Sequence, residues 1–183
     1  MVMAKWNLRA ALPYVGLPVI LTAILVLGAG GTGADILLQR ILIAIFGYIA
    51  SVFDLKERRI PNSLILGMLA AWVLIMVPKL FINTDAAIRS LSDSLLGFAF
   101  GGGVFLIVYL VSRKGLGGGD VKFMAAAGLY LGVGWTIPAM LFGTILAALA
   151  ALTLLALKKI KRKDKIPLAQ FLYAGILITL FLQ

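Results

Sequence analysis

Long runs of apolar side chains, broken only by short polar loops, constrain this chain more than any other feature of its sequence. A helix needs about 20 apolar residues to cross about 30 Å of hydrocarbon. A mean hydropathy of +1.09 and only 13% charged residues are far from the composition of a water-soluble domain. The chain is therefore predicted to be an integral membrane protein, with apolar windows at roughly 12–31, 36–53, 63–82, 93–112, 121–136, 137–157 and 166–182.

The windows indicate helices rather than strands, because they lack the two-residue alternation of a transmembrane β-barrel. The expected fold class is all-α, a polytopic transmembrane helical bundle of six to seven spans. The fifth and sixth windows are separated only by a turn near Trp135, Thr136 and Pro138, as in a tight helical hairpin.

The first window is expected to form an extra N-terminal transmembrane helix within residues 1–35, ahead of a membrane domain at 36–183. Lys5 and Arg9 precede it, so it can also be read as a cleaved signal sequence. The apolar run is long for a signal sequence, which favours a retained helix.

Basic residues gather in alternate loops, and positive charge in short loops stays on the cytoplasmic side. The opposite loops hold only Arg40, Lys79 and Arg89. With seven spans, this distribution predicts a cytoplasmic N-terminus and an external C-terminus. The cytoplasmic set comprises Lys5, Arg9, Lys56, Arg58, Arg59, Arg113, Lys114, Lys122 and the basic residues from Lys158 to Lys165.

The basic tract from Lys158 to Lys165 is expected to contact anionic lipid headgroups, at about 1 kcal/mol per basic residue. The net charge of +10 also invites a nucleic-acid interpretation. No recognition motif or stacking aromatic accompanies the tract, so no nucleic-acid partner is expected.

The sequence contains neither cysteine nor histidine. Thiolate catalysis, a Ser/His dyad and an HExxH metal site are therefore excluded, and carboxylate or Ser/Lys catalysis remains. Ser112 and Lys114 are the Ser/Lys candidates, but two residues apart on a helix they would point in different directions. No metal or cofactor is expected.

Asp54 and Asp120 stand out among the seven acidic residues, because each joins an apolar window to a basic loop on the cytoplasmic side. A single such aspartate is more often a helix-end residue than a catalyst. Asp35, Asp85 and Asp93 are expected in external loops, as solvated residues or helix caps. Glu57 and Asp164 lie among basic residues, whose charge they are expected to balance.

The residues around these aspartates have structural explanations as well. Gly117-Gly118-Gly119 permits unusual dihedrals and close approach of another chain before Asp120. A phosphate-binding loop fails, because GxxxxGK[ST] is absent and Asp120 replaces the last glycine of a GxGxxG frame starting at Gly115. Ile60-Pro61-Asn62 is typical of a turn, with Asn62 capping the third span.

Together, three segments resemble the type IV prepilin peptidases. FDLKERRIPN at 53–62 is similar to the family's first catalytic segment, and GGGDVKFMAAAGLYLG at 117–132 to the second, which carries the GxGD signature. IPLAQFLYAG at 166–175 is similar to an Ile-Pro-led segment that opens a C-terminal helix, although Gln170 replaces the usual proline.

The resemblance implies an intramembrane aspartyl protease that cuts the basic leader from type IV prepilin-like precursors at the cytoplasmic face of a prokaryotic inner membrane. It implies the short, cleavage-only type, like those of tight-adherence pilus systems, without the N-methyltransferase insertion and its paired cysteines. The precursor is the expected partner, and the oligomeric state is left open. The implied catalytic residues are Asp54 and Asp120, with supporting or substrate-binding roles for Gly117, Gly118, Gly119, Lys122, Ile60, Pro61, Asn62, Ile166 and Pro167.

Two carboxylates that share one proton can hydrolyse a peptide bond without a cofactor, because the ionised member activates water and the neutral member protonates the carbonyl oxygen. Partial charges at helix ends would place the shared proton on Asp54, at a C-terminal end, rather than on Asp120, at an N-terminal end. The pair titrates as a unit, so this assignment is provisional.

Other polar and small residues are given packing or lipid-facing roles. Lys56 and Lys122 each lie two residues beyond an aspartate and are expected to extend toward headgroups. The glycine pairs at 97 and 101 and at 128 and 132 are expected to pack helices closely.

Two other functions fit the same aspartates. A small transporter or channel subunit would use them as intramembrane ion sites near the bilayer midplane. A membrane assembly factor would tolerate the loss of either.

Overall fold

The computed structural model describes residues 20, 23, 33–112, 116–159 and 166–182, and in this part of the chain all regular structure is helical. The helices are α2 (Ala34–Glu57), α3 (Asn62–Ile82), α4 (Thr84–Val111), α5 (Gly118–Ala156) and α6 (Ala169–Leu182). The all-α prediction is confirmed. The window at 12–31 lies almost entirely outside the described residues, as do Arg113, Lys114 and residues 160–165 of the basic tract.

Four of the described helices, α2 to α5, are long and apolar enough to cross a membrane, and α6 is shorter. This number is smaller than the six to seven spans expected from the hydropathy windows. The difference has three causes. The window at 12–31 lies almost entirely outside the described residues, the windows at 121–136 and 137–157 both fall within α5, and the window at 166–182 corresponds to the shorter helix α6.

The helix α5 is not straight, because the chain reverses at Gly132. A straight helix of 39 residues would measure about 58 Å, roughly twice the thickness of the hydrocarbon core. Gly132 has φ 69° and ψ 171°, a conformation that favours glycine. A Cβ placed on Gly101 would lie within 4 Å of both Met124 and Thr136, which a straight helix would hold about 18 Å apart.

The reversal divides α5 into two antiparallel arms, as the predicted hairpin requires, but the turn lies before the expected residues near Trp135 and Pro138. Asp93 of α4 accepts a hydrogen bond from the backbone N–H of Val133 at 3.1 Å, and Thr136 Oγ1 donates to the Gly132 carbonyl oxygen at 2.6 Å. These two bonds satisfy backbone groups that the reversal leaves without helical partners.

The prediction that Asp35, Asp85 and Asp93 lie in loops is wrong, because all three lie within helices, whereas the alternative prediction of a helix-capping role is confirmed for Asp93. Asp93 lies inside α4 and caps the second arm of α5, while Asp35 and Asp85 lie in the first turns of α2 and α4. Asp35 forms an ion pair with Lys79 of α3 at 2.6 Å. The apolar windows at 36–53 and 93–112 begin after the first residues of α2 and α4, because those residues are partly polar and lower the average hydropathy. The windows therefore left Asp35 and Asp85 outside the predicted helices and Asp93 at the start of one.

Close contact between α4 and the first arm of α5 depends on glycine. A Cβ on Gly97 would collide with the Gly128 carbonyl oxygen, and a Cβ on Gly128 would collide with the backbone of Gly97. Backbones can approach this closely only where neither helix carries a side chain. The expected packing role is confirmed for Gly97, Gly101 and Gly128, whereas Gly132 forms the chain reversal.

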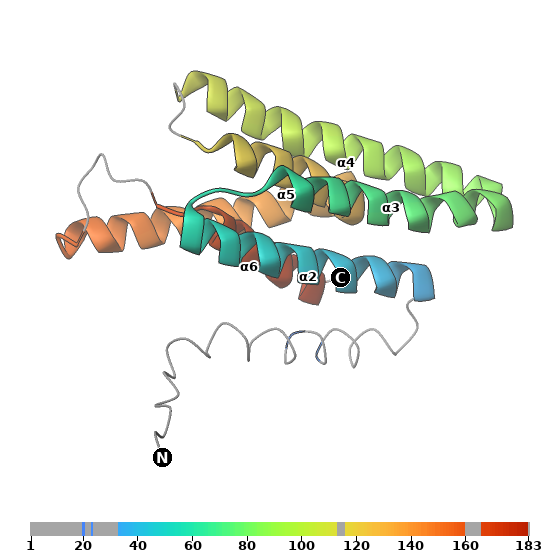
Figure 1. Cartoon of the computed structure of the whole chain (residues 1–183), viewed down its shortest axis with the longest axis horizontal. Helices are drawn as coiled ribbons and strands as arrows, with labels where there is room; N and C mark the ends of the chain where they lie inside the picture. The colour runs from blue at the N-terminus through green and yellow to red at the C-terminus, as the bar shows by residue number, and fades with distance from the viewer. Residues whose placement is uncertain (1–19, 21–22, 24–32, 113–115, 160–165, 183) are drawn as a thin grey trace, which may run out of the picture.

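The bundle brings several chain segments together at one of its ends. Figure 1 shows the end of α2, the start of α5 and the start of α6 on the left, and the junction of α3 with α4 on the right. The side chains of Ile43, Met68, Phe123, Leu172 and Ile176 fill the core and are almost fully buried. Phe123, three residues after Asp120, connects this core to the helix that carries that aspartate.

Replacing Gly97 with alanine should lower the free energy of unfolding by about 1–3 kcal/mol, the usual cost of overfilling a packed contact. The measurement is reversible unfolding in detergent micelles. Gly103→Ala is the matched control, because Gly103 lies in the same helix and has no atom within 4 Å of its Cβ position. Equal stability of the two variants would contradict a contact that depends on glycine.

Candidate active site

Asp54 lies in the last turn of α2 and is only 7% exposed. Its Oδ2 accepts a hydrogen bond from the backbone N–H of Ala169 at 2.9 Å. Ala169 begins α6, so this carboxylate faces the partial positive charge at the start of a second helix. The prediction that Asp54 holds the shared proton was based only on the C-terminal end of α2, and it did not include the start of α6, which favours the ionised form.

Asp120 lies in the first turn of α5 and is also 7% exposed. Its backbone N–H donates to the Gly117 carbonyl oxygen at 3.1 Å. The buried Oδ1 of Asp120 has no hydrogen-bond partner among the residues that the structure describes. Buried carboxylate oxygens are normally paired, and an unpaired one marks a position that demands a functional explanation.

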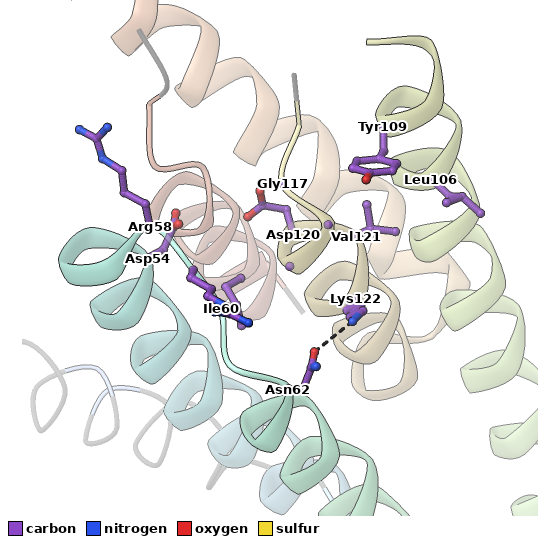
Figure 2. A pocket seen from close by; sticks show the side chains of 13 residues that line it. Asp54, Arg58, Ile60, Asn62, Leu106, Tyr109, Gly117, Asp120, Val121 and Lys122 are labelled. Atoms are coloured by element: carbon purple, nitrogen blue, oxygen red, sulfur yellow. Dashed lines mark hydrogen bonds between the residues drawn. The ribbon is translucent and has the colours of Figure 1, made fainter. Parts of the chain in front are cut away.

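Both carboxylates line one cavity of about 650 Å³. Figure 2 shows the Asp120 carboxylate extending toward the end of α2 that carries Asp54. The sequence places these residues 66 positions apart, and the fold brings them to the same space. The cavity is lined by Asp54, Arg58, Arg59, Ile60, Asn62, Leu106, Tyr109, Gly117, Gly118, Gly119, Asp120, Val121 and Lys122.

A second chamber of about 300 Å³ lies on the α6 side of the aspartates. It shares Asp54, Asp120, Arg58 and Gly117 with the larger cavity, and its own walls are Leu116, Ile166, Pro167 and Leu168. The carboxylates therefore lie where the two chambers meet, and the Ile-Pro segment expected to support the site is part of its wall.

The two aspartate-bearing segments are in direct contact. A Cβ on Gly119 would lie 3.1 Å from the Ile60 Cβ, and Lys122 Nζ donates a hydrogen bond to Asn62 Oδ1 at 3.0 Å. Two predictions are corrected here. Pro61, not Asn62, is the residue that precedes the first turn of α3, and Lys122 bonds to Asn62 rather than extending freely toward headgroups.

Five cavity residues were not singled out as site residues by the sequence, namely Arg58, Arg59, Leu106, Tyr109 and Val121. Arg58, in the left-handed conformation with φ 51°, ends α2 and lines both chambers, but its place in a basic loop suggested only membrane orientation. Leu106 and Tyr109 project from α4. Nothing in the local sequence distinguishes them from other apolar residues of that helix.

Among the described residues, no group of three or more acidic side chains is placed to hold a metal ion. The chemically active groups that the cavity does bring together are two carboxylates, two arginines and a lysine. Such a set can transfer protons and hold a polar backbone.

The sequence model of the type IV leader peptidase family matches residues 41–152, which include both aspartates. The chain belongs to this family. It is 32% identical over 151 residues to the prepilin leader peptidase/N-methyltransferase of Legionella pneumophila, covering 81% of this chain and 52% of that protein. It is 24% identical over 131 residues to the protein of the same name from Bacillus subtilis (strain 168), covering 72% of this chain and 50% of that protein.

The chain thus spans about half the length of the curated leader peptidases that it matches. No solved structure matches it significantly. The resemblance inferred from the three sequence segments is confirmed at the level of the family, and the roles of individual residues remain predictions.

Replacing Gly119 with alanine should lower the free energy of unfolding by about 1–3 kcal/mol, because the added Cβ would press the first turn of α5 away from Ile60. Reversible unfolding in detergent micelles provides the measurement. Gly118→Ala is the matched control, since a Cβ at Gly118 meets no atom within 4 Å. Equal losses of stability in both variants would show that the contact with Ile60 does not matter.

Proposed function

We propose that this protein is an aspartyl endopeptidase that removes the leader peptide from type IV prepilin-like precursors. The observation that carries the proposal is that Asp54 and Asp120, from separate helices, line one cavity in a chain of this family. The relatives are named both as leader peptidases and as N-methyltransferases. The proposal concerns only the peptidase activity, for which this cavity supplies the reactive groups.

In the proposed reaction, the ionised carboxylate removes a proton from a water molecule, and the oxygen of that water attacks the scissile carbonyl carbon. The other carboxyl group donates its proton to the carbonyl oxygen, which gives a neutral tetrahedral intermediate. When the C–N bond breaks, the carboxyl group that gained the proton from water passes it to the departing amine. The carboxylate that gave up its proton recovers one from the collapsing intermediate.

The supporting roles are assigned from the walls of the cavity. Gly117, Gly118 and Gly119 leave room for a peptide backbone beside Asp120, and Ile60 and Asn62 form the facing wall with Lys122. Pro61 lines neither chamber and has a supporting role between Ile60 and Asn62, in a neighbouring pocket. Ile166 and Pro167 close the smaller chamber.

The proposed setting is a prokaryotic inner membrane, with the site at its cytoplasmic face. The ends of α2 and the starts of α5 and α6 meet at the site, and the loops at these positions carry most of the basic residues. This arrangement supports a cytoplasmic site and an external C-terminus. We retain six to seven membrane passes as a proposal, in which the arms of α5 count separately.

The remaining parts of the proposal concern the two ends of the chain and its lipid contacts. Residues 36–183 form the protease domain, and residues 1–35 supply an additional helix. The basic tract from Lys158 to Lys165 contacts anionic headgroups.

The positions of the aspartates favour a peptidase over a transporter or channel subunit. Ion sites in such proteins are expected near the middle of the bilayer. Asp54 lies in the last turn of α2 and Asp120 in the first turn of α5, where a peptide can reach them from the aqueous side.

Asp54→Asn and Asp120→Asn should each lower kcat for leader removal by about 10³-fold or more, since each removes a proton-transfer group. The purified protein in liposomes is incubated with a prepilin precursor, and the shortened product is measured by mass. Asp85→Asn is the matched control, because Asp85 is an exposed aspartate in the first turn of α4 and outside the cavity.

Two results would contradict the proposal. Cleavage that persists in both aspartate variants would exclude the carboxylate mechanism. Absence of cleavage by the wild-type protein, with its fold confirmed by circular dichroism, would exclude the proposed reaction.

A further inference from the structure

A hydrogen bond connects the segments that come after the two aspartates. Lys122, the fifth residue of α5, donates from Nζ to Oδ1 of Asn62 at the start of α3, at 3.0 Å (Figure 2). Asn62 lies eight residues after Asp54, and Lys122 lies two residues after Asp120. The bond therefore joins the two aspartate-bearing parts of the chain across the wall of the cavity.

A second contact lies beside this bond. Gly119 packs so closely on Ile60 that an added Cβ would lie 3.1 Å from the Ile60 Cβ and 3.4 Å from its backbone nitrogen. The two contacts together restrain the start of α5 in two places against the segment that leaves α2. One restraint is apolar and the other is polar.

We propose that Lys122 is a positioning residue, whose hydrogen bond to Asn62 sets the separation of the Asp54 and Asp120 carboxylates. This inference rests on the proposed peptidase function. It differs from a role for Lys122 in contacting substrate and from a role in lipid binding, because it requires Asn62 as well.

Loss of this hydrogen bond should affect the rate of cleavage much more than the stability of the fold. Both Lys122 and Asn62 are exposed, so their hydrogen bond contributes little to the free energy of unfolding. The two carboxylates, in contrast, must hold the attacking water and the scissile carbonyl within a narrow range of distances. A misplacement of a reacting group by 1 Å can lower the rate by about 10²-fold. The variants are thus expected to fold normally and to lose activity.

The activity test compares Lys122→Met, Asn62→Leu and the double variant. Each single variant should lower kcat by about tenfold or more and leave KM within about twofold, and the double variant should lose no more than the less active single variant. Asn62→Leu removes the bond and keeps the lysine charge, so it separates positioning from electrostatics. Asn62→Asp should retain most of kcat, because an aspartate accepts the same bond.

Lys56→Met is the matched control. Lys56 lies after Asp54 at the same two-residue spacing, is exposed and lines neither chamber. Its loss should leave kcat and KM unchanged. An increase in KM alone for Lys122→Met, with normal activity for Asn62→Leu, would overturn the positioning role and indicate direct substrate contact.

A distance measurement tests the same inference without using activity. The sequence has no cysteine, so spin labels can be attached only where Glu57→Cys and Gly118→Cys place them, at the end of α2 and the start of α5. Lys122→Met and Asn62→Leu should each broaden or shift the distance distribution by double electron–electron resonance, and Lys56→Met should not.

The two measurements separate the two proposals. An unchanged distance distribution in both Lys122→Met and Asn62→Leu would overturn the positioning role, even if the wild-type protein cleaves prepilin. If the distance distribution changes in these variants but the unlabelled wild-type protein does not cleave prepilin, the proposed function is overturned. The link between the two segments would still stand.

Discussion

Backbone groups that lie in hydrocarbon must find their hydrogen bonds within their own segment, and the rest of this structure depends on that constraint. It makes every described element a helix and restricts irregular backbone to short stretches between them. Polar chemistry is consequently gathered where helices begin and end. Asp54 and Asp120 occupy such positions, and the N–H at the start of a third helix bonds to Asp54.

The chain reversal at Gly132 is irregular backbone within a helix, and its backbone groups must also find hydrogen-bond partners in the protein. A reversal inside the bundle frees backbone groups that lipid cannot satisfy, and Asp93 and Thr136 supply the missing partners. The reversal leaves the first arm of α5 at about 21 Å, shorter than the roughly 30 Å of a typical hydrocarbon core, so as a membrane pass it requires local thinning of the bilayer. Its glycine contact with α4 at Gly97 and Gly128 therefore holds the arm that carries Asp120.

The sequence predicted the parts of this structure that depend on local composition. Apolar windows predicted helices, and the residues flanking Asp54 and Asp120 indicated the family. The turn in α5 was placed too late, because Pro138 is a recognisable helix breaker whereas the left-handed backbone of Gly132 is visible only in three dimensions. The hydrogen bond between Lys122 and Asn62 joins residues 60 positions apart, and each residue by itself had a plausible local role.

The meeting of two chambers at the carboxylates bears on how the products of cleavage leave the protein. The larger chamber extends toward α3 and α4, and the smaller one is closed by the segment that leads into α6. In the proposed reaction, a peptide cut where they meet would have one new end in each chamber. The two fragments would then contact different residues, with Ile60, Leu106 and Tyr109 on one side and Ile166, Pro167 and Leu168 on the other.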